Sequence, residues 1–175
     1  MDHPLKPRSP YGASKCAARH IVKVYRDSYN LFAIHCILFN HESILRGKQF
    51  VTRKITSNLA HIKYKIEKQE GFDCFELGNI DARRDWSYSN DFMEAIWIML
   101  NQDKPDEYIL SSNKDYSIKE FINMCCKSLG LSNVWQLDED PLNTKMYINN
   151  KLAITINEKY YRPAEIHIMR GDSRE

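Results

Sequence analysis

The chain has 175 residues, of which 43% are hydrophobic and 27% are charged, so it can bury the core of one globular domain or of a domain and a half. Its 25 basic and 23 acidic residues nearly cancel to a formal net charge of +2, which gives no indication of a nucleic-acid-binding or membrane-binding surface. No apolar run approaches the ~20 residues of a membrane span, and the first residues do not read as a signal peptide. We therefore expect a cytoplasmic protein.

The cysteines and histidines show no recognisable metal-binding pattern. Five cysteines occur without any C-x-x-C spacing, and the six histidines include no H-x-x-x-H. We expect reduced, packed thiols and no bound metal. His35 lies within an apolar run and is interpreted as a core residue rather than a ligand.

The first predicted element is a helix over residues 10 to 28. Ser9 is a typical N-cap, Pro10 suits the first helical position, and Asn30 can end the helix in a left-handed conformation. An apolar stripe at helical spacing supports this prediction. It consists of Ala13, Cys16, Ala17, Ile21, Val24 and Tyr25.

Tyr11 and Lys15 fall one turn apart on that helix and therefore share a face. A free phenol has a pKa of about 10, and a cation held beside it favours the phenolate. The pair is thus a candidate for taking a proton from a substrate hydroxyl. The same spacing also occurs on helices where the tyrosine packs and the lysine is only solvated.

The rest of the chain alternates between strand-like and helical patterns. Residues 31 to 38 form a nearly continuous apolar run, typical of a parallel strand buried on both faces. Further strands are predicted at 74 to 77, 108 to 110 and 152 to 156, and further helices from 51 to 66 and from 90 to 102. A last helix begins at a capping box formed by Ser117 and Glu120 and ends at Gly130, whereas residues 138 to 150 are polar and are predicted to form an exposed loop.

This alternation predicts an α/β architecture with a parallel sheet. A dinucleotide-binding unit of that class opens with a glycine-rich turn between a strand and a helix. None of the six glycines fits that spacing, so we expect a partial Rossmann-like sheet without its phosphate-binding front half. An isolated chain of this kind exposes an unpaired, apolar strand and is expected to have poor stability.

Five segments, in order, resemble the GDP-mannose 4,6-dehydratase family of extended short-chain dehydrogenases/reductases. They are residues 7–15 (PRSPYGASK), 38–43 (LFNHES), 50–54 (FVTRK), 77–86 (LGNIDARRDW) and 160–165 (YYRPAE). The first motif alone indicates only the superfamily, which includes nucleotide-sugar epimerases. The second and third segments favour the dehydratase over an epimerase.

The resemblance implies a lyase that converts GDP-mannose to GDP-4-dehydro-6-deoxy-mannose with a recycled NADP, a step of GDP-fucose biosynthesis. Tyr11 matches the base that deprotonates the C4 hydroxyl. Lys15 matches the lysine that lowers the pKa of that tyrosine and holds the nicotinamide ribose.

The resemblance also assigns binding residues. His41 and Arg46 match cofactor-contacting positions. The substrate-binding positions are matched by Asn40, Val51, Lys54, Arg84, Arg162 and Glu165. The chemistry of Lys54, Arg84 and Arg162 agrees with these assignments. A helix start that carries a lysine suits a diphosphate, and an arginine guanidinium can bind two phosphate oxygens at once.

Departures from the family pattern are also visible. The family usually reads ESPRRG where residues 42–47 read ESILRG, so Leu45 replaces one of two cofactor-facing arginines and NADP affinity is in doubt. The threonine and glutamate that the family uses for dehydration have no counterpart in this chain.

We therefore expect residues 1–50 to be a remnant of an NADP-binding domain with the catalytic helix. Residues 51–175 are expected to be mainly a GDP-sugar-binding domain, with segments near 90–111 returning to the sheet. Two functions stay open. The chain is either an enzyme or the sugar-nucleotide half of one, or a non-catalytic fragment that binds GDP-sugar or associates with an intact dehydratase. In the first case the front half was left off by truncation or is supplied by another chain, and the partners left open are a second copy, which makes a homo-oligomer, or a complementing dehydratase chain.

Overall fold

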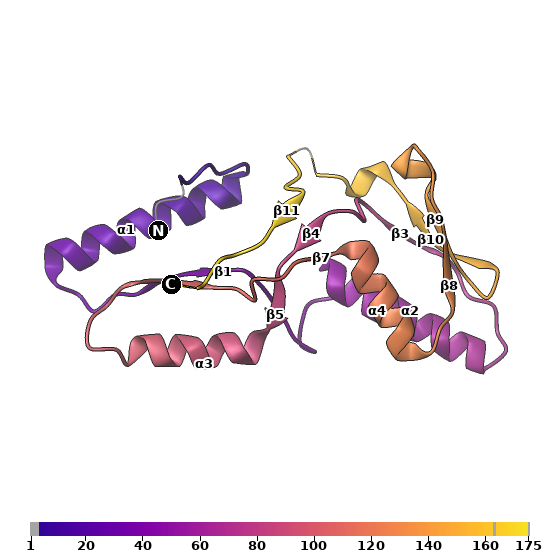
Figure 1. Cartoon of the computed structure of the whole chain (residues 1–175), viewed down its shortest axis with the longest axis horizontal. Coiled ribbons are helices and arrows are strands. Elements are labelled where there is room, and N and C mark those ends of the chain that lie inside the picture. The colour runs from indigo at the N-terminus through magenta and orange to yellow at the C-terminus, as the bar shows by residue number, and fades with distance from the viewer. Residues whose placement is uncertain (1–3, 163, 175) are drawn as a thin grey trace. The chain divides into compact units, whose positions relative to one another are not determined.

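A computed structural model describes residues 4–162 and 164–174 (Figure 1). The chain divides into two compact units, which are treated separately below. Unit 1 comprises Met1–His41, Asp85–Lys114 and Arg170–Glu175. Unit 2 comprises Glu42–Arg84 and Asp115–Met169.

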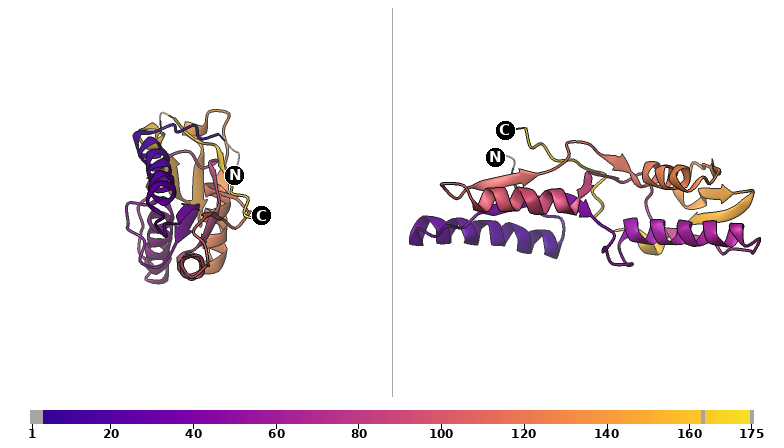
Figure 2. Two further views of the ribbon diagram at one scale, coloured as in Figure 1. Left: turned by 90° about the vertical axis from the view of Figure 1, so that its left-hand side faces the viewer. Right: turned by 90° about the horizontal axis from the view of Figure 1, so that it is seen from below.

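Unit 1 is a two-stranded parallel sheet with two helices. Strand β1 (His35–Leu38) pairs with β6 (Glu107–Leu110), and His35 lies opposite Glu107 in this register. The helices are α1 (Pro10–Tyr29) and α3 (Ser89–Leu100). They lie on opposite sides of the two strands (Figure 2). The strand–helix alternation of the sequence thus predicts this parallel pair correctly.

The ends of α1 are as predicted, but its buried face is not. Ser9 Oγ accepts a hydrogen bond from Gly12 N at 3.0 Å, and Asn30 is left-handed with φ of 51°. No residue of α1 is buried, and Ile21 and Val24 of the apolar stripe are 56% and 57% exposed. The partly covered face instead carries Arg19, whose guanidinium binds the Glu107 carboxylate of β6 through Nε and Nη2.

The predicted strand at residues 31 to 38 is shorter and less buried than its sequence indicates. Only four residues, His35–Leu38, form β1, and none of them is buried. Among the described residues of unit 1, the buried hydrophobic side chains are those of Phe92 and Met99. Since β1 has β6 as its one neighbour in the described sheet and none of its residues is buried, the prediction of burial on both faces is wrong for the described chain.

Unit 2 contains the main hydrophobic core. Its four-stranded sheet has the order β3-β10-β9-β8, in which β10 is parallel to β3 and antiparallel to β9, and β9 is antiparallel to β8. The strands are β3 (Phe75–Leu77), β8 (Asn133–Gln136), β9 (Lys145–Ile148) and β10 (Lys151–Ile156). Helices α2 (Val51–Glu67) and α4 (Ile118–Leu129) pack against this sheet (Figure 1). The fully buried side chains of this core include Ile55, Leu59, Ile122, Cys126, Met146, Ile148 and Ile154.

The capping box of α4 is confirmed. Ser117 Oγ accepts from Glu120 N at 3.0 Å, and the Glu120 carboxylate accepts from Ser117 N at 2.6 Å. Gly130 ends the helix with φ of 65°, a conformation that costs a glycine little.

The predicted exposed loop at residues 138 to 150 is wrong. Its first part contains the short 3-10 helix η1 (Pro141–Asn143), and its second part is strand β9. Met146 and Ile148 alternate along β9 and are fully buried. The alternation of apolar residues is short and lies among polar residues, so the sequence alone does not indicate a strand. Pairing with β8 and β10 stabilises this segment as a strand.

Several short elements complete the description. Strand β4 (Arg83–Arg84) lies between β11 (Ile168–Met169), which is parallel to it, and β7 (Tyr116–Ser117), which is antiparallel. Strand β2 (Asn40–Glu42) pairs with β5 (Trp86–Tyr88), and η2 (Glu158–Tyr160) follows β10. Within residues 4–162 and 164–174, no helix has the length and apolar content needed to cross a membrane.

Candidate functional site

Tyr11 and Lys15 lie on one face of the first turns of α1. Lys15 Nζ is 5.4 Å from the centroid of the Tyr11 ring. Tyr11 is 71% exposed, and Lys15 is also exposed. The predicted juxtaposition of a phenol and an ammonium is therefore present, on a surface where a ligand has access to both.

Asn40 and His41 follow directly after the carboxyl end of β1, where parallel sheets commonly bind ligands. The His41 ring stacks on Phe92 of α3 with the ring centroids 5.0 Å apart. Its Nδ1 lies 3.0 Å from Phe39 O. Because a carbonyl oxygen only accepts, Nδ1 carries the proton in this contact and Nε2 is the acceptor of the neutral ring.

Arg46 is held by its own loop. Arg46 Nε lies 3.2 Å from Glu42 Oε2, and its guanidinium stands 3.6 Å from the centroid of the Phe50 ring. Thr52 Oγ1 donates to the same Glu42 oxygen at 2.8 Å. At the tip of this loop Leu45, which replaces a family arginine, is 89% exposed. The loop therefore has one arginine, already paired with a carboxylate, for any anionic ligand.

Val51 and Lys54 lie in the first turn of α2, whose N-cap Phe50 provides no side-chain hydrogen bond to the helix. Lys54 Nζ donates to Glu76 O at 2.7 Å and lies 4.0 Å from the centroid of the Tyr160 ring. Lys54 is therefore directed toward the middle of β3 and toward η2 within unit 2.

Glu76 collects further polar groups at this place. Its carboxylate accepts from Asn157 Nδ2 at 2.7 Å and forms an ion pair with Lys159. The hydrogen bond from Lys159 lowers the pKa of Glu76 below its ordinary value, and the bond from Asn157 lowers it further. Two ammonium groups, a carboxylate and an aromatic ring thus gather around Glu76 of β3.

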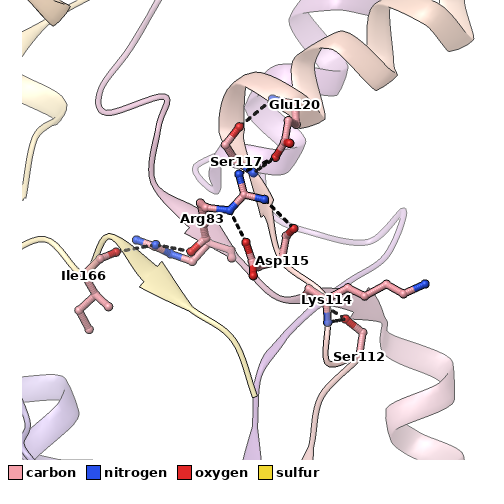
Figure 3. Close-up of polar contacts among 8 residues, drawn as sticks. Arg83, Ser112, Lys114, Asp115, Ser117, Glu120 and Ile166 are labelled. Carbon is pink, nitrogen blue, oxygen red and sulfur yellow. Dashed lines mark hydrogen bonds and ion pairs between the residues drawn. The ribbon is translucent and has the colours of Figure 1, made fainter. Parts of the chain in front are cut away.

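Arg84 and Glu165 form the most sheltered ion pair among the predicted site residues. Arg84 Nη2 donates to Glu165 Oε1 at 2.6 Å, and the two side chains are 12% and 15% exposed. Arg84 Nη1 donates to Arg83 O at 2.8 Å and to Ile166 O at 2.7 Å (Figure 3). Arg162 lies three residues before Glu165 and is exposed. The guanidinium of Arg84 therefore orients Glu165, while Arg162 is accessible to solvent.

Two residues to which the sequence pattern assigned no role also organise the structure. Arg83 binds Asp115 and Glu120, which links β4 to the residue before β7 and to the first turn of α4 (Figure 3). The hydrogen bond to Asp115 raises the pKa of Arg83. Both acidic partners lie more than 30 positions away in the sequence, so no local signal could have identified them.

Asp85 is fully buried in unit 1 and is the second of these residues. Its carboxylate accepts from Ser112 N, Ser112 Oγ and Asn113 N at 2.9, 2.6 and 3.1 Å, and from Gly171 N at 3.3 Å. A side chain at position 171 would overlap Ser111 and Phe39, so glycine is required there. Asp85 thus holds the segment after β6 and the segment around Gly171 in place.

The predicted site residues divide between the two units. Unit 1 contains Tyr11, Lys15, Asn40 and His41. Unit 2 contains Arg46, Val51, Lys54, Arg84, Arg162 and Glu165. In the described part of the chain, no group of three or more histidine, cysteine, aspartate or glutamate side chains is placed to hold a metal ion.

A family model described as GDP-mannose 4,6 dehydratase matches residues 1–175. The chain belongs to the GDP-mannose 4,6-dehydratase family. It is 41% identical over 169 residues to the GDP-mannose 4,6 dehydratases of Cricetulus griseus and Homo sapiens. The matched region is 97% of this chain and 44% of each dehydratase. It is 38% identical over 179 residues to that of Vibrio cholerae, of which it covers 47%. The chain therefore spans less than half the length of these dehydratases.

Solved structures confirm the Rossmann-like fold expected of a GDP-mannose 4,6-dehydratase family member. RMD from Pseudomonas aeruginosa, complexed with NADPH, superposes with a TM-score of 0.72 at 19% identity, over 97% of this chain and 48% of that one. TunA, an NAD-dependent NDP-hexosamine 5,6-dehydratase, superposes with a TM-score of 0.72 at 18% identity, over 99% of this chain and 48% of that one. At these identities the superpositions establish the fold alone.

Proposed function

We propose that this chain forms the catalytic-helix and nucleotide-sugar part of a GDP-mannose 4,6-dehydratase. Family membership over residues 1–175 supports this function. The pair of Arg84 and Glu165 carries the proposal, because it fixes a carboxylate three positions after the exposed Arg162. In this proposal Glu165 accepts from the guanine N–H groups and Arg162 binds the diphosphate.

NADP is the proposed cofactor, and it supplies reversible hydride transfer when bound. Lys15 and His41 hold its nicotinamide end in this proposal, since Lys15 is exposed and the His41 ring, whose Nδ1 faces Phe39 O, is partly exposed. Arg46 contributes less than its family counterpart, because Glu42 already lies 3.2 Å from its Nε. Lys15 and His41 therefore fit the nicotinamide end of NADP better than Arg46 fits its phosphate groups.

Tyr11 is the proposed base. Its Oη takes the proton of the mannose C4 hydroxyl, and Lys15 Nζ lies 5.4 Å from the centroid of the same ring. Asn40 orients the sugar, and Lys54 and the first turn of α2 around Val51 approach the diphosphate. In this proposal Lys54 exchanges its hydrogen bond to Glu76 O for one to a phosphate oxygen.

Turnover is proposed to require groups beyond these 175 residues. The resemblance gives no counterpart for the threonine and glutamate that complete dehydration. In this proposal they come from the rest of the same polypeptide or from a complementing dehydratase chain. The second candidate function is binding of GDP-sugar without catalysis, which needs only the groups of unit 2.

Calorimetric titration with GDP tests the nucleotide site. We expect GDP to bind, UDP to bind more weakly, and Glu165→Gln to lose the preference for GDP. GDP at 100 times its dissociation constant should also add about 2.7 kcal/mol to the free energy of unfolding. Equal affinity for both nucleotides would contradict the assignment of Glu165.

A product assay separates the two candidate functions. The chain is incubated with GDP-mannose and NADP⁺, with and without the part of the Homo sapiens dehydratase that lies outside the matched region, and the keto sugar is measured. Turnover that disappears with Tyr11→Phe in the mixture supports the enzymatic role. GDP binding without turnover in any mixture would support the binding role.

A further inference from the structure

Phe39, which lies between β1 and β2, is held through both its backbone and its ring. Phe39 N donates to the carbonyl oxygen of Leu110, the last residue of β6, at 3.0 Å. The ring lies against Gly171, where a Cβ atom would come within 2.7 Å of Phe39 Cε2. Two segments that are distant in the sequence therefore fix the position of Phe39 within unit 1.

The carboxylate of Asp85 binds both of these segments. Its Oδ1 accepts from Ser112 N at 2.9 Å, two residues after Leu110, and its Oδ2 accepts from Gly171 N at 3.3 Å. The Asp85 side chain is fully buried. A buried carboxylate is costly unless it is hydrogen-bonded, so neither segment can move away from Asp85 without a loss of free energy. Both routes to Phe39 thus begin at one side chain.

The Phe39 carbonyl group in turn orients the ring of His41. His41 Nδ1 lies 3.0 Å from Phe39 O, and the ring stacks on the buried Phe92. The hydrogen bond that one ring nitrogen makes decides which of the two nitrogens carries the proton. The place of Phe39 O therefore sets the orientation and the tautomer of His41, and Asn40 follows on the same stretch of backbone.

We propose that Asp85 is a positioning residue for the candidate cofactor site of unit 1. It fixes Phe39 through the segment after β6 and through Gly171, and it thereby holds the His41 ring with the proton on Nδ1. The inference rests on the proposed function, which gives His41 its contact with the nicotinamide end. Asp85 acts through Phe39 rather than by contact with a ligand, in the way that a supporting shell of hydrogen bonds keeps a binding residue in one geometry.

Nitrogen-15 NMR of the His41 ring in the full chain tests this role. Spectra are recorded at about pH 9, above the ordinary titration range of histidine, where the wild type should show the proton on Nδ1. Asp85→Asn keeps the size of the side chain but has one accepting oxygen, so at least one of the three peptide N–H groups that Asp85 binds loses its acceptor. We expect His41 to lose its Nδ1–H signal in this variant.

The amide spectra of β1 and β6 show whether the variant is folded. A purely stabilising role of Asp85 would leave the tautomer of His41 unchanged in the folded protein. A folded Asp85→Asn protein in which His41 keeps the wild-type Nδ1–H signal would therefore overturn the proposal.

Two further variants support the test. Asp172→Asn is the matched control, because it changes a carboxylate next to Gly171 that binds Arg174, and it should keep the wild-type His41 signal. Gly171→Ala keeps the Asp85 carboxylate but adds a methyl group against Phe39, and it should change the His41 signal even if Asp85→Asn does not fold. An unchanged signal in Gly171→Ala, or a change in Asp172→Asn as large as that in Asp85→Asn, would also overturn the proposal.

GDP titration of the same samples keeps this inference distinct from the proposed function. A chain that does not bind GDP but shows the expected His41 changes would contradict the nucleotide site and leave the role of Asp85 intact. GDP binding together with an unchanged His41 signal in Asp85→Asn would contradict the positioning role alone.

Discussion

Arg84 and Glu165 lie 81 positions apart in the sequence, yet Arg84 Nη2 and Glu165 Oε1 are 2.6 Å apart in unit 2. The arginine also donates to two backbone carbonyl groups, those of Arg83 and Ile166. One guanidinium thus joins β4 to the segment that precedes β11. The Glu165 carboxylate, which is proposed to bind guanine, is oriented by the Arg84 guanidinium. Backbone carbonyl groups of the fold hold that guanidinium in place without a ligand.

This relationship predicts a measurable coupling between the two residues. Arg84→Met should cost ~1–3 kcal/mol of unfolding free energy, because it leaves Glu165 sheltered without its cation. The double variant Arg84→Met, Glu165→Gln should cost less than the sum of the two single changes. Urea unfolding of the four proteins gives this coupling energy. Strict additivity would show that the ion pair contributes nothing.

The hydrophobic core lies mainly in unit 2, so an isoleucine-to-valine substitution should lower the free energy of unfolding more in unit 2 than in unit 1. Ile55 is fully buried in α2, whereas Ile21 of α1 is 56% exposed. Ile55→Val should cost ~0.5–1.5 kcal/mol, and Ile21→Val should stay within ~0.5 kcal/mol of wild type. Both are measured by urea unfolding. A larger loss for Ile21→Val would mean that α1 is covered in solution.

The capping box of α4 predicts a loss that is confined to a helix end. Ser117→Ala removes the acceptor of Glu120 N and should cost ~1 kcal/mol, whereas Ser117→Gly should cost only a few tenths relative to serine. Thermal unfolding of unit 2 gives both values. Ser9→Ala provides a comparison, because it removes the equivalent acceptor from α1, which has no buried residue.

His35 predicts an acid-dependent loss of stability. Burial lowers the pKa of His35 below its ordinary value of 6.5, although Glu107 opposes this shift while Arg19 and Arg26 add to it. The unfolded chain therefore binds a proton at a higher pH than the folded chain does. Below about pH 6.5 the free energy of unfolding falls, and the loss is complete once the pH is below the folded-state pKa.

The His35→Gln variant isolates this contribution. The wild-type and variant proteins should differ by a constant amount above about pH 7.5, and the wild type should lose stability relative to the variant on acidification below pH 6.5. Urea unfolding between pH 5 and 8 measures both curves. Parallel curves over the whole range would show that His35 does not carry the effect.

Local features of this protein follow from its sequence alone. The N-cap at Ser9, the capping box of Ser117 with Glu120, and the left-handed ends at Asn30 and Gly130 all occur where the sequence predicts them. Each depends on hydrogen bonds or dihedral angles within a few neighbouring residues. Tyr11 and Lys15 belong to the same class, because helical spacing alone sets them on one face.

Tertiary structure decided what depends on distant partners. Strand β9 becomes a strand because β8 and β10 lie beside it, and the apolar stripe of α1 stays exposed because the described chain provides no surface to cover it. Arg84 finds Glu165, and Arg83 finds Asp115, only after separate strands are brought together. Strand pairing, ion pairs and burial each need two segments in contact. The local pattern of residues describes one segment and does not say which other segment will lie against it.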